Sequence, residues 1–316
     1  MQTDIPDRLL MEIASQCDRD VAWEYGELVS ELRSRFHDSV DALILYGSCL
    51  RNNDIHSGII DLYVIVGSYR SAYTKKSLRF LNRLLPPNVF YLESGNGPEK
   101  LRIKYTVISM ADFRRGAVDW FHSYIWARFA QPVRLLYARN NKARGEVHEV
   151  LALSALRFLR ASIPLSGECQ SDAATIWTRG FSCAYAAELR PENRNRASQL
   201  VNTDLDVYTR LLTYAVPAMP DLILMQAPDQ FICRAKPALQ QQVLKDWQWR
   251  RRQGRILSIL RLAKATLTFR NPIDYAAWKI ERHTGVRIQV TPFMQRYPML
   301  KGPAVLFQLI RNKVLR

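Results

Sequence analysis

Three residues in the first quarter of the chain have types and spacing suited to binding a nucleotide phosphate and a divalent metal ion. Gly47 and Ser48 follow the apolar run 42–46, and Asp61 stands near the start of a second run, 59–66, thirteen positions after Ser48. A glycine lets the backbone approach a triphosphate, and a serine hydroxyl with exposed amides binds phosphate oxygens. An aspartate that begins the neighbouring strand holds Mg²⁺ against those oxygens. A lone Gly-Ser pair is a common turn, so the interpretation depends on its combination with Asp61.

The segments around these residues predict the elements that position them. The runs 42–46 and 59–66 are short and almost wholly apolar, which is typical of buried strands. Spacing of apolar residues and turn residues adds two helices within 7–36, a helix over 75–85, and strands over 88–92 and 101–108. This alternation predicts an α+β domain with a mixed sheet and flanking helices.

The rest of the chain is predicted to be mainly helical. Residues 117–216 have a helical pattern interrupted by prolines, 246–267 form a strongly basic helix, and a terminal helix with one apolar face follows Pro303. We therefore expect three parts: a first domain over 1–115, a mostly helical domain over 116–233, and a basic C-terminal region over 234–316.

The arrangement of Tyr46-Gly47-Ser48 and Ile60-Asp61-Leu62-Tyr63 resembles the signature of the nucleotidyltransferase superfamily. Most members place a second carboxylate two positions after the first, on the same face of the strand, and here that position is Tyr63. Either another acid completes the metal site, with Asp54 and Glu93 as the nearby candidates, or the protein is catalytically inactive.

A second stretch resembles the mitochondrial-type phosphatidate cytidylyltransferases, which make CDP-diacylglycerol. The residues that carry this resemblance are the run 103–109, then Trp120, Tyr124, Ala127, Arg128 and Gln131-Pro132-Val133, and, near the C-terminus, Lys301-Gly302. The resemblance spans residues 42–137, and Gln131 replaces a lysine of the family. That family also lacks the second acid, so Tyr63 is compatible with activity.

The resemblance implies a role for each matching residue and a winged-helix-like second domain. Gly47 and Ser48 would bind the triphosphate of CTP, Asp61 would bind Mg²⁺, and Lys104 would offset phosphate charge. Asp61 and Lys104 are thus the catalytic candidates, and Arg128 is a candidate for phosphate contact. The alternatives without a functional role are a solvated Lys104 on the outside of its strand and a surface Arg128 paired with an acid such as Asp119.

Two aromatic residues of the same stretch have a structural interpretation. Trp120 and Tyr124 stand four positions apart on an expected helix, and we expect them to lie in the core instead of stacking on a nucleotide.

Charge and composition limit the partners and the compartment. The net charge is +16, of which +15 falls in residues 234–316, and such a segment is attracted to nucleic acid or to an anionic membrane surface. Five cysteines without a CxxC pair indicate a reducing compartment. No secretory signal and no run of about 18 apolar residues occurs, so we expect an intracellular protein that binds the cytoplasmic face of a membrane peripherally.

The function expected from these features is transfer of the cytidylyl group of CTP to phosphatidic acid, with Mg²⁺, at a membrane surface. Nucleic acid is not an expected partner, because the basic region ends in an apolar-faced helix. Two alternatives stay open: a nucleotidyltransferase that acts on RNA, and a nucleotide-binding protein that has lost catalysis. The sequence does not predict an oligomeric state.

Overall fold

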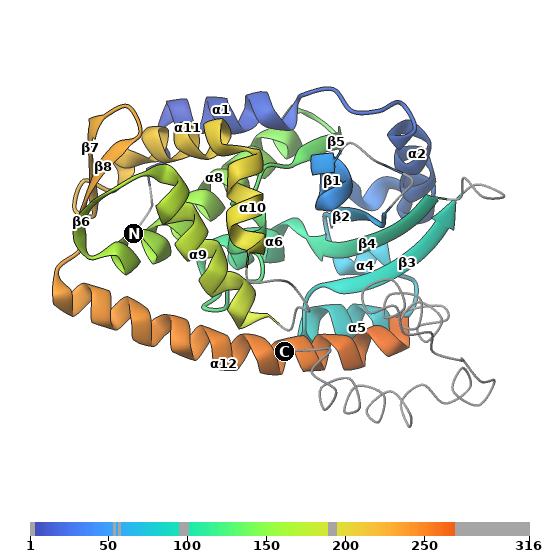
Figure 1. Ribbon diagram of the computed structural model, residues 1–316. Coiled ribbons are helices and arrows are strands. Elements are labelled where there is room, and N and C mark those ends of the chain that lie inside the picture. The colour runs from blue at the N-terminus through green and yellow to red at the C-terminus, as the bar shows by residue number, and fades with distance from the viewer. Residues whose placement is uncertain (1–3, 53–54, 56–57, 95–100, 189–194, 269–316) are drawn as a thin grey trace.

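A mixed five-stranded sheet stands beside a group of helices in this computed structural model (Figure 1). Residues 4–52, 55, 58–94, 101–188 and 195–268 are described. The sheet order is β3-β4-β2-β1-β5, with β2 and β4 parallel and the other neighbours antiparallel. Its strands are β1 (Val40–Tyr46), β2 (Ile60–Val66), β3 (Asn88–Ser94), β4 (Leu101–Ser109) and β5 (Arg134–Ala138). The α+β class and the mixed sheet with flanking helices are confirmed.

The helices divide between the sheet and a second, mostly helical part of the molecule. Those around the sheet are α2 (Tyr25–Phe36), α3 (Ser48–Asn52), α4 (Tyr69–Ala72), α5 (Lys76–Leu84), α6 (Met110–Val118) and α7 (Trp126–Phe129). Those of the helical part are α1 (Asp7–Cys17), α8 (Asn141–Ser162), α9 (Ala173–Ala187), α10 (Arg196–Thr203), α11 (Leu205–Ala215) and α12 (Pro237–Thr268). It also contains an antiparallel sheet, β6-β8-β7, made of β6 (Glu168–Ser171), β7 (Ile223–Ala227) and β8 (Gln230–Arg234). A small sheet beside helices agrees with the winged-helix-like expectation.

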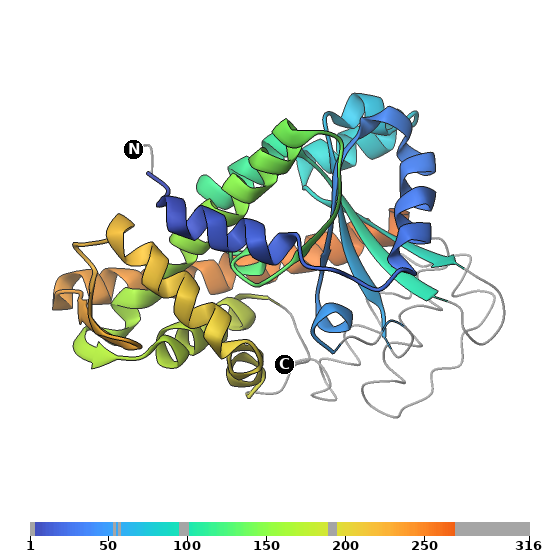
Figure 2. The same cartoon turned by 90° about the horizontal axis from the view of Figure 1, so that it is seen from above.

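Both faces of the large sheet are covered, which explains why its central strands are almost wholly apolar. On one face, Leu43 and Leu62 pack with residues of α2. On the other, Ile44, Tyr63 and Ile65 join a core that continues into α8, α9 and α11. Figure 2 shows α2 and the helical part on opposite faces of the sheet. Asp61 belongs to the second face, because side chains alternate along a strand.

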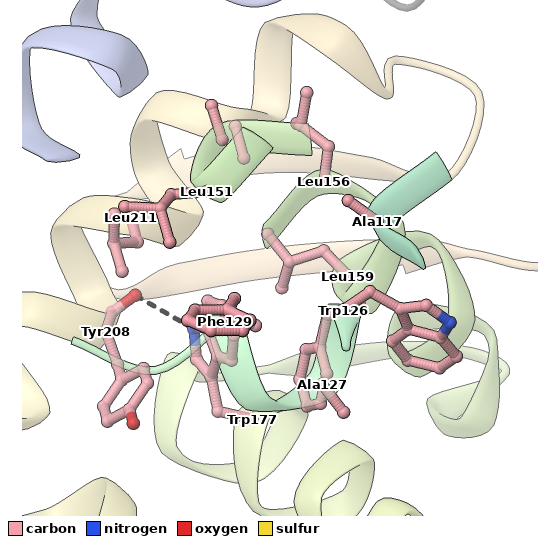
Figure 3. Packing of buried hydrophobic residues seen from close by; sticks show 14 of the residues in the cluster. Ala117, Trp126, Ala127, Phe129, Leu151, Leu156, Leu159, Trp177, Tyr208 and Leu211 are labelled. Atoms are coloured by element: carbon pink, nitrogen blue, oxygen red, sulfur yellow. Dashed lines mark hydrogen bonds between the residues drawn. The ribbon is translucent and has the colours of Figure 1, made fainter. Parts of the chain in front are cut away.

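The core of the helical part is aromatic and tightly packed (Figure 3). Trp177 stacks on Phe158 with ring centroids 5.0 Å apart, and its indole nitrogen donates to the carbonyl of Tyr208 at 2.9 Å. Such aromatic side chains bury large apolar areas, and a buried indole N–H needs an acceptor. This core holds the helical part against the face of the sheet that carries Asp61.

Two segments that were expected to be helical are strands. β5 pairs with β1 as an edge of the large sheet, and β6 pairs with β8. Both are only four or five residues long, and their hydrogen bonds go to strands distant in the sequence, so tertiary pairing decides their conformation. The expected domain boundary at residue 115 stays a prediction. Contacts cross it in both directions, because β5 follows residue 115 but pairs with β1, and α1 precedes it but packs on α8 and α11.

The long helix α12 runs from the helical part to β3 and α5 along one side of the molecule (Figure 1). Its buried positions form one stripe: Val243, Trp247, Arg250, Gly254, Arg261 and Lys264. Spacings of three, four and seven residues keep such a stripe on one face of a helix. The expected basic helix over 246–267 is therefore confirmed as part of α12, and three of its cations face inward. The expected terminal helix and Lys301-Gly302 lie outside the described residues.

Lys264 ties the end of α12 to the turn before β3. Its Nζ donates to the carbonyl of Leu85 and, at 2.6 Å, to that of Pro87. Burial and then the charge of Arg261 lower the pKa of Lys264 to about 7, against an ordinary value of 10.5. Between these two pH values the unfolded chain binds more protons than the folded chain.

The stability of the wild type is therefore expected to gain on that of Lys264→Met as the pH rises through this window. The gain is at most about 1.4 kcal/mol per pH unit. Chemical denaturation of both proteins at about pH 7, 8 and 9 measures the difference in the free energy of unfolding. A difference that stays constant over this range contradicts the lowered pKa of Lys264.

Candidate active site

The Gly47-Ser48 turn lies directly against Asp61. β1 ends at Tyr46, whose partner in the antiparallel register is Asp61 near the start of β2. Gly47 has φ +93°, and a Cβ added there would meet Oδ2 of Asp61 at 2.8 Å. Only glycine accepts both this backbone conformation and this close approach. The half-buried Ser48 then begins α3, so the turn and the carboxylate lie together where β1 ends and β2 begins.

Lys104 completes this group from the other side of Asp61. β2 and β4 are parallel, and their register places Lys104 beside Asp61 on the same face. Nζ of Lys104 lies 2.7 Å from Oδ1 of Asp61, and the two side chains keep exposed fractions of 31% and 20%. The lysine is thus neither a solvated outward residue nor part of the core. The four residues Gly47, Ser48, Asp61 and Lys104, which we call the Asp61 site, thus lie close together, and their roles in binding and catalysis stay predictions.

Tyr63 stands two positions after Asp61, on the same face. It is fully buried, and burial raises the pKa of its phenol well above the ordinary value. Its hydroxyl accepts a hydrogen bond from Nη1 of Arg128 at 2.9 Å. The place of a second carboxylate is therefore taken by a neutral phenol that is tied to an arginine.

Arg128 lies close to the Asp61 site, on the short helix α7. Its guanidinium carbon is 4.2 Å from the ring centroid of Tyr124 and 5.7 Å from that of Tyr46. Nη2 lies 3.4 Å from Oε2 of Glu188, which follows α9. Arg128 therefore does not form a surface pair with Asp119, and it is placed at the junction between the sheet and the helical part.

The expected helix through Trp120 and Tyr124 is wrong. α6 ends at Val118, and the carbonyl of Trp120 accepts from the indole of Trp126 at 3.2 Å and from Arg157 at 3.2 Å. Side chains thus take the place of a helical amide at this carbonyl. Both aromatic residues do pack at the edge of the large core, as expected.

Arg261 is a neighbour of this group that the sequence did not reveal. It lies on the buried stripe of α12, and its guanidinium carbon is 3.9 Å from the ring centroid of Tyr124. Two arginines therefore lie over one tyrosine ring. The heptad-like spacing of the stripe was the one signal in the sequence that pointed to Arg261, but the helix looked simply basic.

The Asp61 site offers Mg²⁺ one carboxylate ligand, that of Asp61. In the described ranges, no three His, Cys, Asp or Glu residues lie close enough together to share a metal ion. Mg²⁺ in nucleotide sites is commonly held by one or two carboxylates together with substrate phosphates and waters. Asp61 with a bound triphosphate meets that description.

Neither expected second acid adds a ligand among the described residues. Asp54 lies outside the described residues. Glu93 lies on β3 with β4 between it and β2, and its Oε1 accepts from the hydroxyl of Tyr91 at 2.9 Å.

Comparison with known proteins adds little to this geometry. No protein-family model matches the chain, and no curated protein matches its sequence. Among solved structures, the chain is similar to a nucleotidyltransferase-like protein from Exiguobacterium sibiricum, with 12% identity over 93% of each chain. The TM-score is 0.27, which is too low for this likeness to support a conclusion about fold or function.

Proposed function

We propose that this chain is a nucleotidyltransferase whose active centre is the Asp61 site. The observation that carries the proposal is the contact between Asp61 and the Gly47-Ser48 turn, where Gly47 leaves no room for a side chain. A bare backbone turn beside a carboxylate and an ammonium group suits a triphosphate bound through a divalent cation.

Each residue of the site has a part in the transfer. An oxygen of the acceptor attacks the α-phosphorus of the nucleotide, and pyrophosphate leaves. Gly47 and Ser48 bind and orient the triphosphate, and Asp61 holds the charge-neutralising cation beside it. Mg²⁺, when bound, stabilises the negative charge that develops on the phosphate oxygens. Lys104 orients the carboxylate of Asp61 in the resting chain and offsets phosphate charge once substrate is bound.

CTP and phosphatidic acid are the proposed substrates, and the surface of α12 favours action at a membrane. Trp249 and Ile256 are each 60% exposed, and Leu260 is 49% exposed. Arg251 and Arg252 are exposed on the same helix, and the guanidinium carbon of Arg252 lies 5.1 Å from the ring centroid of Trp249. Apolar side chains among cations are typical of helices that lie on an anionic bilayer. No helix in the described part of the chain is long and apolar enough to span a membrane.

Vesicle flotation tests this membrane contact. Replacing both Trp249 and Ile256 by Ala is expected to lower partitioning onto vesicles that contain phosphatidate by roughly tenfold, because two apolar side chains lose their burial. Trp23→Ala is the matched control, since Trp23 is 77% exposed on a different part of the molecule. Equal flotation of the double variant and the wild type would contradict the proposal that α12 contacts the membrane.

Release of pyrophosphate tests the reaction itself. Purified protein with CTP and Mg²⁺ is expected to release pyrophosphate when phosphatidate in mixed micelles is added, and CDP-diacylglycerol should form in equal amount. Release that requires RNA instead would show an RNA-directed transferase. Binding of CTP without release on either acceptor would show a protein that has lost catalysis.

A further inference from the structure

Arg261 is a buried cation with an unsatisfied hydrogen-bond donor. The side chain is 9% exposed, and its Nε is buried with no hydrogen-bond partner. Its guanidinium carbon lies 3.9 Å from the ring centroid of Tyr124. An arginine offers five N–H donors, and leaving a buried one unmet is costly. An acceptor oxygen supplied by a bound ligand would satisfy this donor.

Positive charge exceeds negative charge around Arg261. Arg128 lies over the same tyrosine ring, and Glu188 is the carboxylate that faces them, at 3.4 Å from Nη2 of Arg128. Burial and then the charge of Arg261 lower the pKa of His122 to about 3, so His122 is neutral near pH 7. The Nδ1 atom of His122 is also buried and lacks a partner. Among the described residues, two guanidinium groups thus face one carboxylate, and such a place attracts an anion.

This group of cations adjoins the Asp61 site. Arg128 bonds the hydroxyl of Tyr63, two positions along β2 from Asp61. Tyr46 links the two groups, because it is the register partner of Asp61 and its ring centroid lies 5.7 Å from the guanidinium carbon of Arg128. Burial raises the pKa of its phenol to about 12, and the charges of Lys104, Asp61 and Arg128 also act on it. A ligand held by Arg128 and Arg261 is therefore next to a nucleotide held at Asp61.

We propose that Arg128 and Arg261 form a phosphate subsite beside the Asp61 site, which holds the phosphate monoester of the acceptor substrate. The identity of the acceptor, phosphatidate, rests on the proposed function. The prediction that the subsite binds a phosphate group rests on the two arginines alone. A phosphate monoester carries nearly two negative charges and three acceptor oxygens, which suit the forked donors of two guanidinium groups. α12 then contributes a substrate-binding residue and is more than a basic surface.

The direction of the pKa shift of Tyr124 agrees with this view. Burial raises the pKa of its phenol, but the charges of Arg128 and then Arg261 outweigh burial, and the pKa lies below its ordinary value. The positive potential that lowers the pKa of this phenol also favours a bound phosphate.

Isothermal titration with a soluble short-chain phosphatidate, dihexanoyl phosphatidate, tests the subsite without turnover. We expect the wild type to bind it, Arg261→Gln to bind it roughly tenfold more weakly or worse, and Arg261→Lys to fall between them, because lysine keeps the charge but lacks the planar fork. Lys245→Gln is the matched control, since Lys245 is a cation on the same helix but is exposed. Mg-CTP titrated into each protein shows which phosphate the subsite holds.

The outcomes separate cleanly. Weaker binding of dihexanoyl phosphatidate by Arg261→Gln, with Mg-CTP binding unchanged, assigns the subsite to the acceptor. Weaker binding of Mg-CTP alone keeps a phosphate subsite but assigns it to the nucleotide. Unchanged binding of both probes overturns the proposal. If Arg261→Gln fails to fold by circular dichroism, Arg261→Lys decides in its place. The assay of pyrophosphate release tests the proposed function separately from these titrations. The protein can bind phosphatidate at the subsite without catalysing transfer, and it can catalyse transfer without using this subsite.

Discussion

Asp61→Asn is expected to lower nucleotidyl transfer by roughly 100-fold or more, because it removes the carboxylate that, among the described residues, faces the Gly47-Ser48 turn. The substitution preserves shape but not charge. The lost ion pair with Lys104 is partly exposed, so the free energy of unfolding should fall by about 1 kcal/mol or less. Steady-state rates of pyrophosphate release, with thermal unfolding measured in parallel, check both parts.

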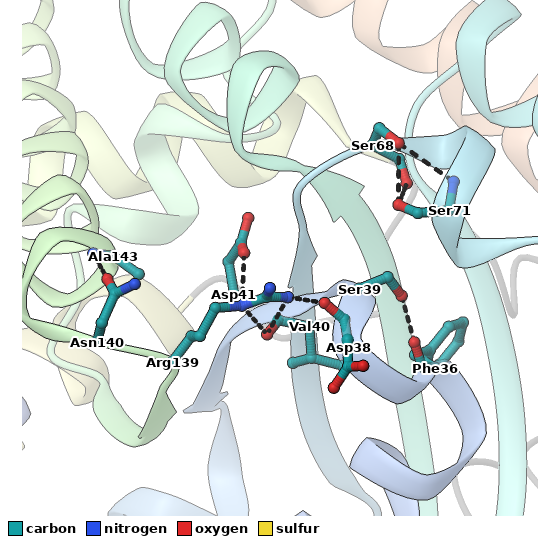
Figure 4. A network of polar contacts seen from close by, with 10 residues as sticks. All are labelled: Phe36, Asp38, Ser39, Val40, Asp41, Ser68, Ser71, Arg139, Asn140 and Ala143. Carbon is teal, nitrogen blue, oxygen red and sulfur yellow. Dashed lines mark hydrogen bonds and ion pairs between the residues drawn. The ribbon is translucent and has the colours of Figure 1, made fainter.

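Asp41→Asn is the matched control for Asp61→Asn. Asp41 also belongs to the large sheet, at the opposite end of β1 from Gly47, and its Oδ1 lies 3.2 Å from Nε of Arg139 (Figure 4). This variant loses a comparable ion pair away from the site, so it should keep the transfer rate of the wild type. Full activity in Asp61→Asn would mean that another group neutralises the triphosphate.

Gly47→Ala is the second substitution with a large expected effect. A side chain at φ +93° is strained, and the new Cβ would stand 2.8 Å from Oδ2 of Asp61. The turn or the carboxylate must move, so we expect a loss of transfer of roughly 100-fold and a loss of stability of about 1–3 kcal/mol. Rates at saturating CTP and chemical denaturation measure the two losses.

Gly145→Ala provides the comparison. Gly145 lies inside α8, and nothing would come within 4 Å of an added Cβ. Alanine is the better helix former, so this variant should be unchanged in activity and more stable by up to about 1 kcal/mol. If Gly47→Ala were equally harmless, the close approach between the turn and Asp61 would have no functional meaning.

The Asp61 site was predictable because it depends on local order along the chain. Two apolar runs predicted β1 and β2, and a residue that follows one strand lies near a residue that begins its antiparallel neighbour. Lys104 followed from the strand that became β4 and from the family resemblance. These features are set by a short segment and one strand pairing, so periodicity and turn residues carry them.

The rest of the neighbourhood depends on packing between distant segments. Arg261 lies on α12, and Glu188 lies at the end of α9. The two helices can approach closely because Gly254 has no side chain, and an added Cβ there would clash with the carbonyl oxygen of Ala187. Nothing in the sequence near Arg261 specifies that contact. In the same way, β5 is a half-buried edge strand whose conformation is set by pairing with β1.

The central claim is that Asp61 and a bound triphosphate together hold a divalent cation beside the Gly47-Ser48 turn. Titration of Mn²⁺ followed by electron paramagnetic resonance, with and without CTP, tests it directly. We predict tight binding of Mn²⁺ to the wild type and to Asp41→Asn only when CTP is present, and its loss in folded Asp61→Asn. Equal binding of Mn²⁺ and CTP by Asp61→Asn and by the wild type would contradict the account.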